Sequence, residues 1–586
     1  MKNIFKLFKR FEEDYKYFNL IIVTLSIIMG LLPVINIYAP KLIIENLETE
    51  INTLYIGKII VAVLLANIIL VLLRRIYEAY FTLVFESMTD KLTFELSEKA
   101  MKLPIEDTDS KDIQDKLEKA HISVFNIYDL WETLNISTSS LITGIFAIII
   151  LVKLNIFIPL LGLAIVFINR IFVKLIKKNE IYYQNKSAGE NRIYRYFANF
   201  AQDNKYSKDI KIYDGEELIL DKSKKYMDKL INTNKDYYTK NGIYGGMMNI
   251  TSSVGIVIAL IYLTYRLTEN TVGLADFTLY FSSIIQLINT VNIVQKNYAQ
   301  VISVNENMKS YFDFINLPEK EIENNKKVNL NLDKLSIRFD NVSFKYPKSE
   351  SFILKDCSFE IKDGETVALV GKNGAGKSTI VKLLCKFYDP TEGDIYINDT
   401  NIKDITSKDY YKILSPTFQD FRLFPFKISE NILACKEEEV SRYDIDKARD
   451  STKLLGINDW ISSHKNGYST YITTLFNDSG IEPSGGIGQK IALARSMAHG
   501  GRFFIMDEPT SALDPRSEQE IFEHMLEISK GQTSLFISHR LSSTKYADRI
   551  IVCDDGHIIE NGKHEDLIRK NGLYKEMFNS QKELYS

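Results

Sequence analysis

Six apolar stretches, each long enough to cross a lipid bilayer, dominate the first 300 residues of this 586-residue chain. A membrane-spanning helix needs about 20 mostly apolar residues. Several of the stretches carry no charge, and the basic residues of the others lie near their ends. So many runs favour six transmembrane helices over the buried helices of a soluble core. The runs cover residues 19–38, 56–74, 135–152, 156–176, 243–265 and 273–295.

Lysine and arginine are concentrated in the connection after the second run and in the connection after the fourth, whereas the loop after the first run is mainly acidic. Because cytoplasmic loops carry the excess of basic residues, we expect a multi-pass protein of the cell membrane with both termini cytoplasmic. Both connections are rich in helix formers and predict helical hairpins that extend about 40 Å from the bilayer. Their turns are expected near residues 104–115 and 203–213. The basic first ten residues predict an interfacial helix rather than a removable signal peptide.

Overall charge and cysteine usage exclude several other classes of protein. The chain has 72 basic and 75 acidic residues, a formal net charge of −3, which argues against a nucleic-acid partner. Its four cysteines all lie in the second half and lack the spacing of a metal site or a redox pair. We therefore expect neither a zinc module nor a disulfide framework.

The second half of the chain begins with a polar linker, residues 316–333, and then alternates strand-like and helix-like segments. One strand-like segment runs into GKNGAGKST, in which glycines let backbone N–H groups wrap phosphates. Lys377 is placed to reach the β and γ oxygens, and Ser378 to ligate Mg²⁺. The sequence thus predicts an α-helical membrane domain, residues 1–315, followed by an α/β phosphate-loop domain, residues 334–586. The predicted ATP-binding residues of the loop are Gly371, Asn373, Gly374, Ala375, Gly376, Lys377, Ser378 and Thr379.

Two carboxylates end a later strand-like segment, RFFIMDE. Asp507 is suited to hold Mg²⁺, and Glu508 to orient or deprotonate the attacking water. The alternative is an exposed acidic pair after an ordinary strand, but the phosphate loop in the same chain favours catalysis. His539 ends another strand-like segment, LFISHR, beside the expected position of the γ-phosphate. A lone histidine would be interpreted as structural, so only its neighbours support a catalytic role.

Together these motifs resemble ATP-binding cassette (ABC) transporters of the exporter type, such as bacterial peptide, drug and lipid exporters, whose membrane domain precedes the nucleotide-binding domain. The resemblance extends over essentially the whole chain. It implies that Tyr346 stacks on adenine and that Gln419 senses Mg²⁺ with Ser378 and Asp507 and touches the membrane domain. It also implies that the loop ending at Asp514 passes along the opposite site and that His539 contacts the γ-phosphate.

The signature segment departs from the family pattern. The family sequence LSGGQ reads PSGGI here, with Pro483 and Ile487 at its two ends. Ser484, Gly485 and Gly486 are retained, so a serine cap and open amides at a helix N-terminus can still address a phosphate. We expect this phosphate contact to be kept; the effect of the altered ends on hydrolysis is left open.

The resemblance implies a dimer, because the signature of one nucleotide domain completes the site of another in this family. Glu508 and His539 are both present, which favours a homodimer over a heterodimer. ATP and Mg²⁺ are the implied cofactors and membrane lipid the implied surroundings. The implied activity is an ATPase, releasing ADP and phosphate, that drives export by alternating access.

The cargo is the part of the function on which the sequence is least informative. A peptide or an amphipathic small molecule is the expectation, with a lipid flippase or an importer of the same fold as alternatives. The sixth run carries a polar stripe at helical spacing that either lines a route for cargo or forms hydrogen bonds between helices. The stripe consists of Ser282, Gln286, Asn289 and Asn292.

Overall fold

The computed structural model divides into two compact units. Met1–Lys102 and Ser110–Pro318 form the first, and Leu103–Asp109 and Glu319–Ser586 form the second. Most of the predicted linker, at residues 320–333, lies outside the part of the chain that the structure describes. The described residues are 2–49, 51–202, 204–319, 334–347, 349–474, 477–508, 531–538 and 541–585.

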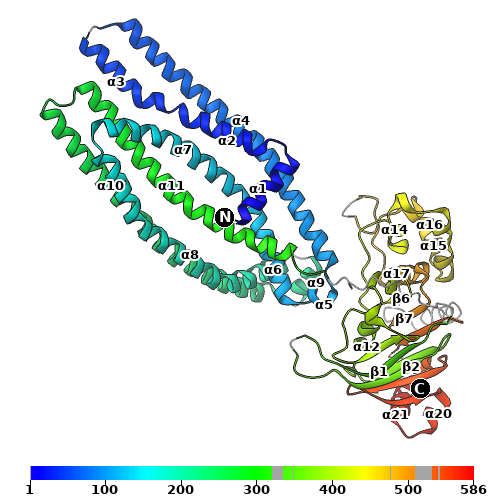
Figure 1. Ribbon diagram of the computed structural model, residues 1–586. Coiled ribbons are helices and arrows are strands. Elements are labelled where there is room, and N and C mark those ends of the chain that lie inside the picture. The colour runs from blue at the N-terminus through cyan, green and yellow to red at the C-terminus, as the bar shows by residue number, and fades with distance from the viewer. Residues whose placement is uncertain are drawn as a thin grey trace. The chain divides into compact units, whose positions relative to one another are not determined.

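The first unit is helical throughout its described residues (Figure 1). Six segments are long and apolar enough to cross a membrane, which confirms the predicted number of spans. Helix α8 runs along α10, and α11 runs along α7. The helices are α1 (Lys2–Asp14), α2 (Phe18–Leu31), α3 (Val34–Thr49), α4 (Thr53–Lys102), α6 (Lys111–Phe125), α7 (Ile127–Leu154), α8 (Phe157–Gln202), α9 (Asn204–Ile212), α10 (Glu216–Thr268) and α11 (Leu274–Ile315).

The first span differs from the single continuous run that the sequence predicts. It consists of two helices, α2 and α3, separated at Leu32 and Pro33. Proline has no N–H to donate and its ring clashes with the preceding turn, so a helix interrupted at Pro33 follows from its covalent structure. Pro40 lies inside α3, which continues past it.

Both predicted turns of the long connections are present. After α4 the chain makes a short helix, α5 (Ile105–Thr108), before α6; between α8 and α10 it makes α9. Leu103–Asp109, which contains α5, belongs to the second unit. Within that unit the Tyr388 hydroxyl donates to Asp109 Oδ2 at 2.7 Å.

The amphipathic helix α1 packs through one face and leaves the other open. Ile4, Leu7 and Phe11 are buried, whereas Phe5 is 70% exposed. The Phe11 ring lies 5.4 Å from that of Trp131 on α7. Because the buried residues recur at helical spacing, one face of α1 packs against the rest of the unit and the opposite face is exposed.

Hydrogen bonds between amide and hydroxyl side chains join the spans inside the first unit. Asn169 on α8 is fully buried and donates to Gln295 Oε1 on α11 at 3.1 Å. Ser252 on α10 donates to Asn292 Oδ1 at 2.6 Å. Such contacts hold transmembrane helices together where burial from water supplies little net attraction. Asn292, one residue of the predicted stripe, thus serves helix packing.

The second unit contains two sheets and confirms the predicted α/β class. The order β2-β1-β4-β5 forms an antiparallel sheet, and β10-β9-β3-β8-β7-β6 a sheet that is parallel except at β10. Their bounds are β1 (Ile337–Phe344), β2 (Leu354–Ile361), β3 (Thr366–Gly371), β4 (Glu392–Ile397), β5 (Thr400–Asn401), β6 (Leu414–Thr417), β7 (Phe503–Asp507), β8 (Thr533–Ile537), β9 (Arg549–Asp554) and β10 (His557–Gly562).

Alternate residues of β3 face two separate cores. Val367 and Leu369 join the core shared with the antiparallel sheet, and Ala368 and Val370 join the core under the helices of the other face. This is the two-residue period of a strand buried on both sides. The described helices are α12 (Lys377–Leu384), α13 (Ser407–Tyr411), α14 (Ile428–Leu433), α15 (Arg442–Leu454), α16 (Asn458–Ser463), α17 (Gly485–His499), α19 (Leu541–Thr544), α20 (His564–Arg569) and α21 (Leu573–Tyr585).

We predict that two phenylalanines of α1 respond oppositely to truncation. Phe11→Ala removes a fully buried ring and should lower the free energy of unfolding by about 3–5 kcal/mol. Phe5→Ala removes an exposed ring and should change it by no more than about 0.5 kcal/mol. Thermal unfolding of the full chain in detergent measures both. Equal losses would mean that α1 does not pack through the face containing Phe11.

Candidate nucleotide site

The predicted nucleotide-binding segments meet at one edge of the six-stranded sheet. Strands β3, β8, β7 and β6 are neighbours in that order and run parallel, so their carboxyl ends lie at the same edge. The phosphate loop follows β3, the segment containing Gln419 follows β6, and Asp507 ends β7. Ligands of open α/β sheets bind at this edge.

Two glycines of the phosphate loop are required by the backbone itself. A Cβ on Gly371 would lie 2.0 Å from the carbonyl oxygen of Cys553, at the end of β9. Gly376 has φ 104°, a left-handed conformation, and is the N-cap of α12. A loop with these constraints directs its backbone toward a ligand at the N-terminus of α12, as phosphate binding requires. The Cys553 thiol supports it by donating to Ala375 O at 2.9 Å.

Lys377 is turned back onto its own loop. Its ammonium group donates to Gly371 O at 2.8 Å and to Lys372 O at 3.0 Å, and the side chain is 6% exposed. Burial lowers the pKa of Lys377, and the nearby Glu508 carboxylate opposes that shift. The two carbonyl contacts hold the charge where β and γ oxygens can replace them.

Gln419 and the two carboxylates are brought together, as the sequence predicts for a shared site. Gln419 Nε2 donates to Glu508 Oε2 at 3.0 Å. Glu508 has φ 48°, a strained conformation for a residue other than glycine, and its N–H donates to Ile537 O at 3.2 Å. The carboxylate is therefore oriented by β8 as well as by its own strand.

The donor set fits a magnesium ion. Asp507 is 7% exposed, and its buried Oδ1 atom has no hydrogen-bond partner among the residues that the structure describes. Burial, and then the carboxylates of Glu508 and Asp420, raise the pKa of Asp507 to about 6. Carboxylate, hydroxyl and amide oxygens are the ligands that Mg²⁺ prefers, and Asp507, the exposed Ser378 and Gln419 supply them.

Tyr346, the residue proposed to stack on adenine, lies within an aromatic group beside the loop. Its ring is 5.3 Å from that of Tyr388 at 90°, and Lys382 Nζ lies 5.2 Å from the Tyr346 centroid. The Tyr346 hydroxyl is 3.3 Å from Thr379 Oγ1. The half-buried ring is thus positioned next to the helix that begins at Lys377.

The signature segment keeps the geometry of a helix N-terminus despite its altered ends. Ser484 is the N-cap of α17, with its Oγ accepting from Ile487 N at 3.5 Å. Ideal Cβ atoms built on Gly485 meet nothing within 4 Å. Pro483 precedes the cap, where a missing N–H leaves no helical hydrogen bond unmade. The open amides of α17 can therefore approach a phosphate.

Two of the predicted site residues, His539 and Asp514, lie outside the described residues. The described segment before His539 ends at Ser538, and the described segment before Asp514 ends at Glu508.

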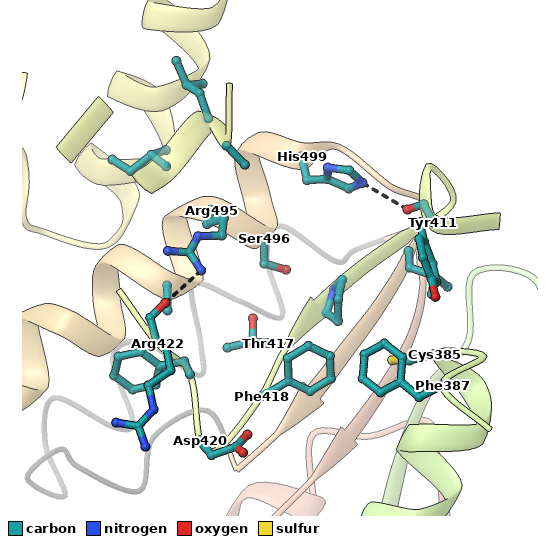
Figure 2. Close-up of a pocket in the computed structure, with 17 residues that line it drawn as sticks. Cys385, Phe387, Tyr411, Thr417, Phe418, Asp420, Arg422, Arg495, Ser496 and His499 are labelled. Atoms are coloured by element: carbon teal, nitrogen blue, oxygen red, sulfur yellow. Dashed lines mark hydrogen bonds between the residues drawn. The ribbon is translucent and has the colours of Figure 1, made fainter. Parts of the chain in front are cut away.

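A cavity of about 390 Å³ borders the site on the side of β6 (Figure 2). Thr417, Phe418 and Asp420, which flank Gln419, form one wall, and Arg495 of α17 forms another. The Arg495 guanidinium donates to Asn431 O at 2.7 Å and to Arg422 O at 3.2 Å. The cavity therefore lies between the Gln419 segment and the helix that begins at the signature.

Sequence reasoning missed two residues of this region. Asp420 contributes to the raised pKa of Asp507, and its position directly after Gln419 was the available signal. Tyr388 joins the aromatic group around Tyr346, which only the return of the chain after α12 brings close. Neither role follows from a motif.

Comparison with known proteins identifies both halves of the chain. A model of the ABC transporter transmembrane region matches residues 19–291, and a model of the ABC transporter matches residues 354–511. The subtilin transport ATP-binding protein SpaT of Bacillus subtilis is 30% identical over 600 aligned residues, which cover 99% of this chain and 94% of that protein. The ATP-dependent lipid A-core flippase of Haemophilus ducreyi is 33% identical over 58% of this chain and 57% of its own length.

The fold is similar to that of a bacterial Atm1-family ABC exporter with ATP bound, with a TM-score of 0.80, 24% sequence identity and coverage of 96% of this chain and 97% of that one. One membrane region and one nucleotide-binding region make a half-transporter, an arrangement that implies dimerisation. The chain belongs to the ABC transporter family and is a multi-pass, exporter-type half-transporter that binds ATP and couples its hydrolysis to transport.

Proposed function

We propose that Glu508 is the general base of ATP hydrolysis and that Lys377 binds the β and γ oxygens. The observation that carries this proposal is the convergence of Lys377, Gln419, Asp507 and Glu508 at one sheet edge. A carboxylate held at a strained strand end can accept a proton from water beside the γ-phosphate. Gln419 donates to one Glu508 oxygen, so this amide must turn away for that oxygen to accept from water.

Asp507, with Ser378 and Gln419, is proposed to hold Mg²⁺. The bound ion would neutralise charge on the phosphate oxygens. Asp507 contributes a buried oxygen, and Gln419 links the ion to Glu508. Tyr346 is proposed to stack on adenine, supported by its half-buried ring beside α12, with its hydroxyl 3.3 Å from Thr379 Oγ1.

The working unit is proposed to be a homodimer in which Ser484, Gly485 and Gly486 of one copy complete the site of the other. The open N-terminus of α17 supports this assignment, because a Cβ built on Gly485 would meet no described atom within 4 Å outside its own helix and its chain neighbours. His539 and Asp514 keep their proposed roles as γ-phosphate contact and opposite-site loop by sequence alone. A heterodimer would place this altered signature in the partner's site.

The nucleotide-binding unit is proposed to lie in the cytoplasm, supported by the basic connections that lead toward it. Closure of two nucleotide units would then act on the turns that hold α5 and α9. Support comes from Asp109, which belongs with the second unit and accepts the Tyr388 hydroxyl.

A peptide or amphipathic molecule is proposed as the cargo, supported by the near full-length similarity to a protein named for subtilin transport. A lipid cargo is the second candidate, supported by the similarity to lipid A-core flippases. On α11 the side chain of Asn289 is exposed, and Gln286 is half-buried, so these two members of the stripe remain available to cargo.

Asp507→Asn is predicted to stabilise the ATP-free chain while abolishing Mg²⁺-dependent turnover. The folded pKa of about 6 lies above the unfolded value of 3.8, so the ionised carboxylate destabilises the fold above pH 6, by up to about 3 kcal/mol. That penalty disappears as the pH falls from 6 toward 4. Thermal unfolding at pH 8 and pH 5 should show a gain at pH 8 that shrinks at pH 5. The exposed Asp404→Asn should show neither effect.

Glu508→Gln is predicted to lower ATP turnover by about 100-fold or more while ATP still binds, because water loses its proton acceptor. Phosphate release from the chain purified alone in lipid vesicles measures this, with the exposed Glu392→Gln as matched control. ATP turnover by the wild-type chain alone would support a homodimer. Absence of turnover in both the wild type and Glu508→Gln would indicate that a second chain is required. Near-normal turnover in Glu508→Gln would contradict the assignment.

We predict that Asn289→Leu affects the contact with cargo, whereas Asn292→Leu affects the packing between helices. Asn289→Leu should alter stimulation of turnover by a panel of amphipathic peptides and by lipid A, with basal turnover and stability kept. Asn292→Leu leaves the buried Ser252 hydroxyl without its acceptor and should cost about 1–3 kcal/mol of stability. An unchanged stimulation profile for Asn289→Leu would exclude this face from the cargo route.

A further inference from the structure

A band of lysines and tyrosines surrounds the paired helices α8 and α10 where their apolar spans end. The band, defined as residues 174–186 of α8 and 235–244 of α10, contains six lysines and two acidic residues, a net charge of +4. These are Lys174, Lys177, Lys178, Lys186, Lys235 and Lys240 against Glu180 and Asp236.

The depth of the band matches the headgroup layer of a bilayer. The apolar part of α8 begins at Phe157, and the 17 residues from there to Lys174 rise about 26 Å at 1.5 Å each. The hydrocarbon core is about 30 Å thick. Tyr182 is 58% exposed and Tyr238 is 69% exposed, and tyrosines at this depth are typical of the membrane interface.

Direct contacts between the two helices hold the band in shape. Asn179 Nδ2 donates to Asn241 Oδ1 at 2.7 Å, and Lys240 Nζ donates to the Tyr183 hydroxyl at 3.0 Å. The Tyr183 and Tyr237 rings lie 5.8 Å apart. A charged surface that is fixed by contacts between the two helices loses little side-chain and backbone freedom when a ligand binds.

Three lysines of the band have charges that nothing described in the structure neutralises. Lys174, Lys178 and Lys235 are exposed and form no ion pair with any side chain in the described ranges. Of the two acidic residues, Glu180 accepts the Ser303 hydroxyl at 3.0 Å. Juxtamembrane lysines attract anionic lipid, and the attraction decays within a Debye length of about 8–10 Å.

We propose that this band binds the phosphate headgroups of anionic phospholipids in the cytoplasmic leaflet. The inference rests on the proposed orientation of the chain, with its basic connections and the nucleotide-binding unit in the cytoplasm. Lysines supply the charge, and Tyr182 and Tyr238 supply amphipathic rings at headgroup depth. The occupant is a bilayer lipid, rather than a second copy of the chain.

The test uses the full chain in phosphatidylcholine vesicles that contain a fraction of phosphatidylglycerol, without ATP. Electron paramagnetic resonance compares the protein-associated fractions of spin-labelled phosphatidylglycerol and spin-labelled phosphatidylcholine. The wild type should favour phosphatidylglycerol at least about threefold at low salt, and less as salt rises. The triple variant Lys174→Gln, Lys178→Gln and Lys235→Gln should bring the ratio close to one, and the three Lys→Arg changes should keep it.

A matched control removes the same charge, three lysines, from α10 farther from the apolar span. Lys222, Lys224 and Lys225 of α10 are exposed, and Lys225 lies ten residues from Lys235, or about 15 Å along the axis. Their change to Gln should leave the lipid ratio unchanged. A control that lowers the ratio equally, or a band variant that leaves it unchanged, would overturn the proposal.

The outcomes separate this inference from the proposed function. Lipid association is read without nucleotide, so a chain that hydrolyses no ATP still reports it. If a second copy covers the band instead, the triple variant would weaken subunit association in mass photometry and leave the lipid ratio unchanged. That result would also overturn the proposal.

Discussion

A buried carboxylate and a buried ammonium group at one edge of a parallel sheet organise the nucleotide-binding unit. Asp507 and Lys377 are each less than a tenth exposed. Lys377 is held by carbonyls of its own loop, and Oδ1 of Asp507 has no hydrogen-bond partner among the described residues. Buried charges are costly unless they are paired, and the proposed ligands, triphosphate and Mg²⁺, carry charges opposite to those of Lys377 and Asp507.

The membrane unit depends on a different constraint, because burial from water contributes little to the association of its helices inside a bilayer. Buried amides and hydroxyls such as Asn169, Gln295 and Ser252 provide that attachment. Attached helices move together as packed groups, and α4 alone, at 50 residues, spans about 75 Å. Helices of this length are suited to transmit a movement at one end of the unit to the spans at the other.

Features carried by short sequence patterns were predictable. Apolar length identified six spans, and glycine spacing with a strand before and a helix after identified the phosphate loop. Features that depend on tertiary neighbours were not. The contact between Gln419 and Glu508 joins residues 89 positions apart. On α11, Asn289 is exposed, whereas Asn292 accepts the Ser252 hydroxyl of α10. Pro33 was visible in the sequence, but apolar run length concealed the helix break that it causes.

The central claim is that two copies of this chain build each nucleotide site together, and mixing two inactive variants tests it directly. Lys377→Ala removes the proposed phosphate contact, and Gly485→Asp places a carboxylate at the N-terminus of α17, where a Cβ meets no described atom within 4 Å outside its own helix and its chain neighbours. Each variant alone should be inactive. A mixed dimer contains one site with both halves intact, so co-expression should restore ATP turnover to a substantial fraction of the wild type. Turnover that stays at the level of the separate variants would contradict the shared site.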